Sequence, residues 1–177
     1  DRNDNKDVTL FDGKTQSLNF ALAAKSVNIN TADLYFTPSE RTDSTVTMTA
    51  EAGKGKALII RYRLGSDYML HTQLQAVGLG GDFAPSATQM DVQWKEMCRQ
   101  QERGFTFENR YASLTYHKVD GGTDYLSEAK SITDENIEKK IDWVAFKNRF
   151  FSAVMIAKNN FAENSLMTSV PQEKGSG

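Results

Sequence analysis

Cysteine is nearly absent from this sequence of 177 residues, which contains Cys98 alone. A single cysteine excludes an internal disulfide and a zinc site built from several thiolates. Histidine is almost as scarce, and neither His71 nor His117 stands at a spacing typical of metal ligands. We therefore interpret all three residues as ordinary strand or surface positions and expect no metal and no cofactor.

Long hydrophobic runs are also missing. The longest, such as residues 20–24 and 153–157, have five residues, whereas a helix needs about 20 apolar residues to cross a bilayer. We expect no membrane span in this chain. Positive charge is not in excess either, because 21 Lys and Arg stand against 23 Asp and Glu. Nucleic acid is therefore not an expected partner.

Catalytic motifs are lacking as well. The sequence has no glycine-rich phosphate loop, no G-x-S-x-G turn and no H-E-x-x-H pair. The glycines of "VGLGGDF", residues 77–83, resemble a dinucleotide fingerprint only superficially, because no helical pattern follows and Pro85 comes soon after. We interpret this segment as a turn and expect no enzyme.

The two ends resemble those of a piece cut from a longer protein. The sequence begins at Asp1 without an initiator methionine or a leader, and it ends in Gly-Ser-Gly. A missing signal peptide therefore says nothing about compartment. A chain of this length fits one domain, which buries roughly 70% of the surface exposed by its unfolded form.

Alternation of apolar and polar residues with a period of two dominates the sequence and predicts half-buried strands. In residues 68–77 this pattern places Leu70 and Leu74 inward. In residues 46–50 it places Val46, Met48 and Ala50 on one face and Thr47 and Thr49 on the other. Glycine-containing turns at 52–56, 65–67 and 120–122 separate the runs. The spacing is typical of a large antiparallel sandwich. The clearest runs are residues 46–50, 58–64, 68–77, 90–94 and 112–117.

Other segments have weaker patterns. Residues 90–104 predict a strand to about Glu96 and then a polar turn or short helix, although a helix from an N-cap at Thr88 to Gly104 also fits. Residues 131–142, "SITDENIEKKID", favour a loop or a short helix. In the first 35 residues we expect only weak strands, around Val8–Phe11, Leu18–Ala21 and Val27–Ile29.

Residues 142–161, "DWVAFKNRFFSAVMIAKNNF", form the richest aromatic and aliphatic stretch. As a strand, residues 150–156 have apolar side chains on both faces, which predicts a central strand covered on both sides. A helix would group Trp143, Phe146, Phe150 and Val154, but the branched residues favour a strand. These aromatic residues then belong to the core. Alternatively they form an exposed surface for a partner, with Trp143, Phe146 and Phe150 as its contact residues.

Three ordered segments resemble a known family. "DWVAFKNRFFSAVMIAKNN" is similar to the tryptophan-started strand of the large periplasmic domain of YidC membrane protein insertases, with its Trp-Val-Ala opening and aromatic pair. "YRLGSDYMLHTQLQAVGL", residues 62–79, is similar to a strand, turn and strand of that domain. "RQQERGFTFENRYASLTYHK" followed by "DYLSEAK" resembles the Bacteroides-type branch. The resemblance covers roughly residues 32–177, and residues 1–31 remain a weakly assigned N-terminal segment.

The resemblance implies a fold and a setting. The fold is an antiparallel super-β-sandwich of the galactose-mutarotase type, mainly β with at most short helices. Residues 1–177 would be a single periplasmic domain or part of one, on the periplasmic side of the bacterial inner membrane. The family's membrane helices and a further "YFGP"-like strand are expected outside this sequence.

The resemblance also implies a function. The domain would be non-enzymatic and would assist the insertion and folding of membrane proteins. Its partners would be components of the Sec translocon and nascent membrane proteins, and it would act as a chaperone-like contact surface or as a structural spacer. No catalytic residue is carried over.

A carbohydrate-binding or sugar-converting function is the alternative, since mutarotase-like sandwiches often serve sugars. This chemistry pairs an acid with a base, commonly a histidine with a carboxylate. His71 and His117 lie on separate expected strands, and Glu102, Glu108 or Asp124 are the carboxylates that could join them.

Overall fold

The computed structural model of the chain describes residue 9 and residues 13–101, 103–127 and 131–172. Within these residues the chain is mainly β, with thirteen strands, one α helix of five residues and one short 3-10 helix. The strand pairs with a described register are antiparallel. The prediction of a mainly β chain with short helices is confirmed. In the described part of the chain no helix has the length and hydrophobicity needed to cross a membrane.

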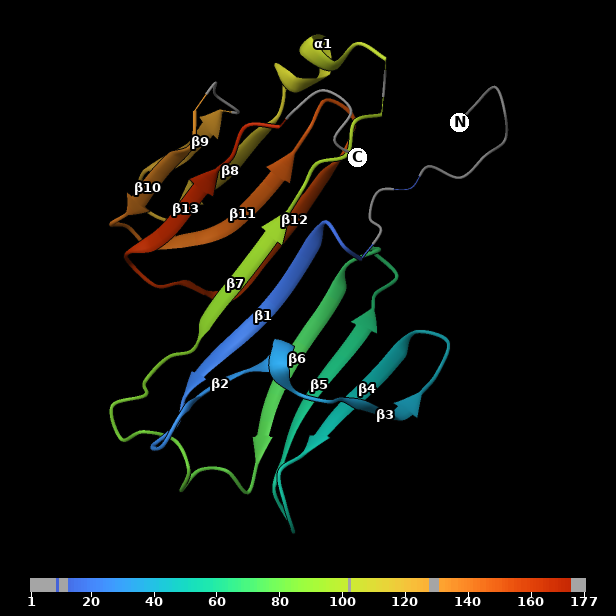
Figure 1. Ribbon diagram of the computed structural model, residues 1–177, viewed down its shortest axis with the longest axis vertical. Helices are drawn as coiled ribbons and strands as arrows, with labels where there is room; N and C mark the ends of the chain where they lie inside the picture. The colour runs from blue at the N-terminus through green and yellow to red at the C-terminus, as the bar shows by residue number, and fades with distance from the viewer. Residues whose placement is uncertain (1–8, 10–12, 102, 128–130, 173–177) are drawn as a thin grey trace. The chain divides into compact units, whose positions relative to one another are not determined.

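The chain divides into two compact units, unit 1 of residues 1–16 and 95–177 and unit 2 of residues 17–94. Unit 2 contains a four-stranded sheet in which consecutive strands are neighbours (Figure 1). The strands are β3 (Thr37–Arg41), β4 (Thr45–Glu51), β5 (Ala57–Leu64) and β6 (Leu70–Val77). Glycine-containing turns join β4 to β5 and β5 to β6 where the sequence predicts them, and a turn without glycine, residues 42–44, joins β3 to β4.

A smaller sheet with the order β2-β1-β7 packs on the first sheet within unit 2. Ala50, Leu58 and Leu79 form the buried core there, and Leu22 of β1 packs against them. Burial of these apolar side chains between two layers is the main source of stability for such a unit. The smaller sheet consists of β1 (Gln16–Ala23), β2 (Asn28–Asn30) and β7 (Asp91–Glu96), and the 3-10 helix η1 (Thr31–Asp33) follows β2.

The glycines of residues 78–81 form a turn, as predicted. Gly78 has a φ of +64°, and a side chain there would collide with the backbone oxygen of Gly55 in the turn between β4 and β5. Only glycine satisfies both conditions at low cost. The approach of the two turns is supported by an ion pair of 2.9 Å between Lys56 and Asp82.

A buried asparagine connects three elements of unit 2. The side chain of Asn19 on β1 accepts hydrogen bonds from the Thr31 hydroxyl (3.1 Å) and the Ala32 amide (3.0 Å) at η1. It donates one to Gln93 of β7 (3.1 Å). Because buried polar groups are costly unless they are satisfied, this network fixes η1 and β7 against β1.

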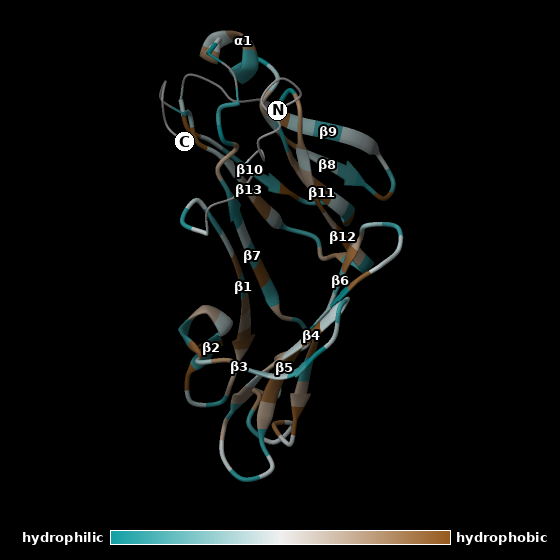
Figure 2. Cartoon of the chain, turned by 90° about the vertical axis from the view of Figure 1, so that its right-hand side faces the viewer, coloured by the Kyte–Doolittle hydropathy of each residue, from teal (hydrophilic) through white to brown (hydrophobic). Residues whose placement is uncertain are grey.

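Unit 1 contains a four-stranded sheet with the order β12-β11-β8-β9 and a separate pair of strands, β10 and β13. Apolar and polar residues follow one another within single strands, as the alternating colours in Figure 2 show. The elements are α1 (Phe105–Asn109), β8 (Ser113–Lys118), β9 (Gly122–Ser127), β10 (Thr133–Ile137), β11 (Ile141–Lys147), β12 (Ser152–Phe161) and β13 (Ser165–Ser169).

One face of the four-stranded sheet forms the core of unit 1 together with the β10–β13 pair. Leu114, Tyr116 and Val144 are buried on this face, and Ile137 and Met167 are buried on the strand pair. Strand β13 contacts β8 and β9. The Tyr116 hydroxyl donates a hydrogen bond of 3.1 Å to Glu135 on β10, so the two layers are joined by a polar contact as well as by burial.

Residues 142–161 do not form the single central strand that the sequence predicts. They form a hairpin of β11 and β12 that is interrupted at residues 148–151. Strand β11 is central, but β12 has only β11 as a partner among the described residues. Val154 and Ile156 on β12 are 49% and 57% exposed. The prediction of a strand was therefore right for its type and wrong for its length and for burial on both faces.

Other predictions need correction. Residues 133–137 form strand β10 instead of a loop or helix, because they pair with β13 from far along the chain. The short helix begins after Gly104, so a helix from Thr88 to Gly104 is wrong, whereas the strand ending at Glu96 is confirmed. Leu70 at the start of β6 is 60% exposed, the reverse of the inward position that alternation predicts.

The weak N-terminal strands are partly confirmed. Residues 18–21 lie within β1, and residues 27–29 overlap β2. The strand expected at residues 8–11 lies outside the described residues apart from Thr9, which has no regular structure.

Ile137 is expected to be essential for the stability of unit 1. Its side chain is 3% exposed, so Ile137→Ala should leave a cavity and lower the free energy of unfolding by about 2–5 kcal/mol. Ile132→Ala is the matched control because Ile132 is 63% exposed, and it should change stability by less than about 0.5 kcal/mol. Urea unfolding measures both, and equal effects would contradict the burial of β10.

Tyr116 should make the chain less stable at alkaline pH. Burial, followed by the hydrogen bond to Glu135, raises the pKa of Tyr116 to about 12, whereas an unfolded tyrosine has a pKa of about 10. Between these values the unfolded state releases a proton that the folded state retains, so the free energy of unfolding falls as pH rises. Urea unfolding at a series of alkaline pH values should show that Tyr116→Phe loses this part of the slope. Tyr125→Phe, an exposed control on the neighbouring strand, should keep it; identical slopes for all three proteins would refute the assignment.

Candidate functional site

The three aromatic residues expected as contacts lie in different places. Trp143 and Phe146 are three residues apart on β11, so their side chains point to opposite faces of the sheet. Phe146 pairs with Leu114 and Ala153 on the core side, and Trp143 lies on the other side. Phe150 is in the turn between β11 and β12 and is 44% exposed. Sequence proximity therefore does not make one site of them.

Trp143 belongs to a sheet face with exposed apolar side chains, which we call the Trp143 face. Ile156 of β12 is directly opposite Trp143, and Val154 is opposite Ala145, so all four point to this face. Tyr125 on β9 joins the same row through Thr115 and is 62% exposed. The face thus presents apolar and aromatic groups to its surroundings along an edge strand.

His117 lies beside Trp143 on this face. The two rings are stacked, with centroids 6.0 Å apart and planes 9° from parallel. The Nδ1 atom of His117 lies 2.8 Å from a carboxylate oxygen of Asp142. A register shift between Ile141 and Trp143 allows Asp142 to reach the side of the sheet on which His117 lies.

The other residues expected to pair with the histidines do not join His117. Asp124 is opposite Tyr116, hence on the core side of the sheet, and binds Lys118 at 3.2 Å. Glu108 is buried in α1, where both of its carboxylate oxygens accept the backbone N–H of Gln101 at 3.0 Å. His71 is an exposed residue of β6 in unit 2, and Glu102 lies outside the described residues.

The turn between β11 and β12 is fixed by Asn148. Its side-chain oxygen accepts hydrogen bonds from the backbone N–H groups of Phe150 (2.8 Å) and Phe151 (2.7 Å). The backbone N–H of Asn148 donates to the Phe151 carbonyl at 3.0 Å. Asparagine commonly closes turns in this way, and the buried Asn148 here ends the aromatic strand and turns Phe150 outward.

Three aromatic rings, those of Phe107, Tyr111 and Phe150, surround the guanidinium group of Arg149. We call these four residues the Arg149 cluster. The guanidinium carbon lies 4.1 Å from the ring centroid of Phe107 and 5.3 Å from that of Phe150. Phe107 and Tyr111 meet edge to face at 5.8 Å. Sequence reasoning missed Phe107 and Tyr111. They follow Gly104 and are four residues apart, a spacing that places two side chains on one face of a helix.

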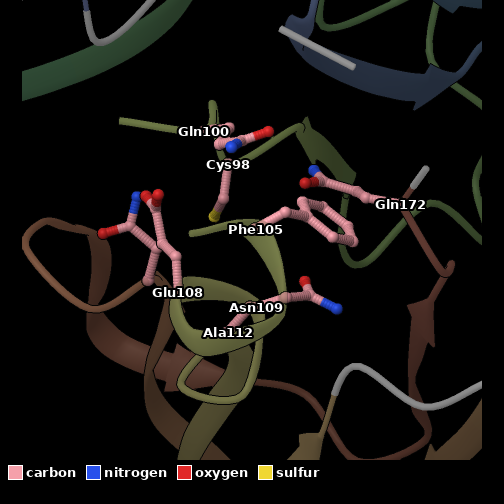
Figure 3. A pocket seen from close by; sticks show the side chains of 8 residues that line it. Cys98, Gln100, Phe105, Glu108, Asn109, Ala112 and Gln172 are labelled. Atoms are coloured by element: carbon pink, nitrogen blue, oxygen red, sulfur yellow. The ribbon is translucent and has the colours of Figure 1, made fainter. Parts of the chain in front are cut away.

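Two small cavities are found in unit 1. The first has a volume of about 10 Å³, close to the minimum for one water molecule. Phe105, Glu108 and Asn109 of α1 surround it opposite Cys98 (Figure 3). The second, of about 70 Å³, is lined by Phe146 and Phe151 among others. His117 borders neither of these two cavities, and its side chain and that of Asp142 are 32% and 37% exposed.

No group of three or more histidine, cysteine or carboxylate side chains that could hold a metal ion is found among the residues that the structure describes. Cys98 is half-buried between the cavities and is not part of a disulfide.

Comparison with known proteins gives consistent matches. The model of the YidC periplasmic domain family matches residues 1–175. The membrane protein insertase YidC of Phocaeicola vulgatus is 45% identical over 175 residues, which are 98% of this chain and 28% of that protein. The corresponding insertase of Bacteroides fragilis is 38% identical over the same shares. That of Porphyromonas gingivalis is 32% identical over 171 residues, 91% of this chain and 27% of the relative.

These matches extend the resemblance that the sequence motifs predict. Residues 1–31, which match no motif quoted above, fall inside the family match. The chain spans little more than a quarter of the length of the relatives named here. No solved structure matches the chain.

Asn148 is expected to hold the β11–β12 turn. Asn148→Ala removes the oxygen that accepts two backbone N–H groups, and leaving them unsatisfied should lower the free energy of unfolding by about 1–3 kcal/mol. Asn159→Ala on β12 is the control, because Asn159 is exposed, and it should be nearly neutral. Chemical denaturation followed by tryptophan fluorescence measures both; an Asn148→Ala variant as stable as the control would show that the turn does not depend on this side chain.

Proposed function

Because the chain belongs to the family of YidC periplasmic domains, we propose that it assists the insertion and folding of membrane proteins through contacts with Sec components or with substrate segments. The domain is non-enzymatic and lies on the periplasmic side of the bacterial inner membrane, as its family does. The chain represents a little over a quarter of the relatives' length. The proposal is therefore limited to the contacts that the surfaces of this part make.

The finer fold assignment is part of the proposal. We propose that residues 1–177 form one periplasmic domain or part of one, with the super-β-sandwich topology of the galactose-mutarotase type. Its support is the family match together with the antiparallel sheets of each unit.

The observation that carries the proposed contact is the exposed edge strand β12. This strand is ten residues long and pairs, among the described residues, with β11 alone. An edge strand offers unpaired backbone N–H and C=O groups to which an extended peptide can add. Natural proteins usually protect such edges with charges or proline, but β12 carries Val154 and Ile156, about half exposed, and Lys158 as its only charged residue.

Side chains of the Trp143 face supply the second part of the contact. A peptide that pairs with β12 directs alternate side chains to this face, where Val154, Ile156 and Trp143 form an apolar row. Trp143 is therefore proposed as a contact residue. Phe146 acts indirectly, because it lies on the core side, where it borders the second cavity together with Phe151. Phe150 contributes from the Arg149 cluster.

Hydrogen–deuterium exchange of the 177-residue chain tests this contact. The probe is a water-soluble peptide of alternating valine and serine, flanked by lysines, as a mimic of an extended substrate segment. We expect slower exchange of β12 amides when the peptide is added. The variant Val154→Asp/Ile156→Asp should lose this protection, because charges replace the apolar side chains that the peptide covers.

The control variant makes the same two substitutions elsewhere. Val27 and Ile132 are 67% and 63% exposed, so Val27→Asp/Ile132→Asp makes the same change in charge and removes at least as much exposed apolar surface. It should keep the protection of β12. Absence of protection anywhere on the chain, or equal protection in the Val154→Asp/Ile156→Asp variant, would refute the proposed contact.

A further inference from the structure

The Arg149 cluster and its neighbour Phe151 expose an unusual amount of aromatic surface. Phe107, Tyr111 and Phe150 are 44%, 47% and 44% exposed, and Phe151 is 38% exposed. All four come from two short segments of unit 1, residues 103–111 and 147–151. Rings of this size are normally buried, so a group of them at the surface needs a physical account.

The charges of the same two segments are of one sign. Arg103, Arg110, Lys147 and Arg149 are all exposed. Glu108 is the single acidic residue of these segments, and it is 4% exposed and bonded to the Gln101 backbone. The exposed charge of residues 103–111 and 147–151 is therefore wholly positive, although the whole chain has a net charge of -2.

The rings and charges are held in place by local structure. Phe107 of α1 and Tyr111, two residues beyond the helix, meet edge to face, and neither borders the first cavity, which Phe105, Glu108 and Ala112 line. Arg149 lies over the Phe107 ring at 4.1 Å, a cation–π contact that joins α1 to the β11–β12 turn. Asn148 fixes that turn. Little conformational freedom of the backbone is lost when such a surface binds.

We propose that the Arg149 cluster, with Arg103, Arg110, Lys147 and Phe151, docks on a bilayer surface containing anionic phospholipids. Aromatic side chains prefer the zone between lipid headgroups and acyl chains, and nearby arginine and lysine side chains bind the phosphate groups. Neither cavity of unit 1 is lined by Phe107, Tyr111, Arg149 or Phe150. Of the residues proposed to dock, Phe151 alone borders one of these two cavities, an arrangement that suits contact with a fluid lipid surface better than insertion of one side chain of a protein partner.

The setting makes this contact reachable. The domain belongs to a family of inner-membrane insertases, so a bilayer surface is part of its surroundings. The inference rests on this membership and on the Arg149 cluster, and Phe150 is the one residue that it shares with the proposed peptide contact at β12; the charge variant described below leaves Phe150 and β12 unchanged. One contact can therefore fail in an experiment while the other is retained.

Co-sedimentation of the 177-residue chain with lipid vesicles tests the proposal. We expect binding to phosphatidylcholine vesicles that contain about a third phosphatidylglycerol, weaker binding at high salt, and little binding to phosphatidylcholine alone. The variant Arg110→Gln/Lys147→Gln should lower the partition coefficient about thirtyfold, because each removed charge contributes close to its full surface attraction. At high salt the attraction between charges is screened and the aromatic contribution remains. Under this condition Phe107→Ser/Phe150→Ser should bind vesicles more weakly than the unmodified chain does.

Matched controls change the same residue types elsewhere. Arg41→Gln/Lys54→Gln removes two exposed positive charges of unit 2, and Tyr35→Ser/Tyr68→Ser removes two rings of unit 2 that are 85% and 89% exposed. Both should bind anionic vesicles like the unmodified chain. Circular dichroism verifies that every variant is folded, and the charge variants keep the proposal testable if removal of Phe107 unfolds α1.

Three results would overturn the inference. The first is no binding to anionic vesicles, and the second is equal binding to neutral and anionic vesicles. The third is equal loss of binding in the cluster variants and in their controls. If the cluster variants instead keep vesicle binding and lose protection by the peptide probe used for β12, the Arg149 cluster is a protein contact and the lipid proposal is wrong.

Discussion

The pairing of β11 with β8 on one side and β12 on the other is the interaction on which unit 1 depends. Because β11 is central, its two faces have different surroundings: Val144 is buried toward the β10–β13 pair, and Trp143 lies with His117 on the other face. The same pairing leaves β12 at the edge of the sheet. Core, exposed face and sheet edge therefore all follow from the position of one strand.

Local pattern was sufficient for much of the fold. Strands β4, β5, β7 and β8 were predictable because each alternates apolar and polar residues and is bounded by a turn or a polar segment. Strand β10, "TDENI", was not, because four of its five residues are polar and its partner β13 lies about thirty residues later. Ile137 is its one strongly hydrophobic residue, and it is buried against another layer of unit 1. The sequence pattern alone does not show where that layer lies.

The candidate surfaces were less predictable than the strands. Trp143, Phe146 and Phe150 carry the same hydrophobic signal in the sequence, but a strand's period of two separates the first two, and the side chain of Asn148 removes the third from the strand. One buried amide therefore decides where Phe150 lies. Phe107 and Tyr111 were missed because α1 is only five residues long and begins after Gly104, too short for a clear helical period.

The order of strands β10 and β13 has a consequence for how the chain acquires its structure during synthesis and export. Residues 133–137 and 165–169 pair across the whole β11–β12 hairpin, so the hairpin lies inside a loop that the pair closes. Because the N-terminus of the chain emerges first, β10 has no strand to pair with until β13 has also emerged. Ile137 stays uncovered during that interval, and unit 1 completes its second layer only as the last described strand arrives.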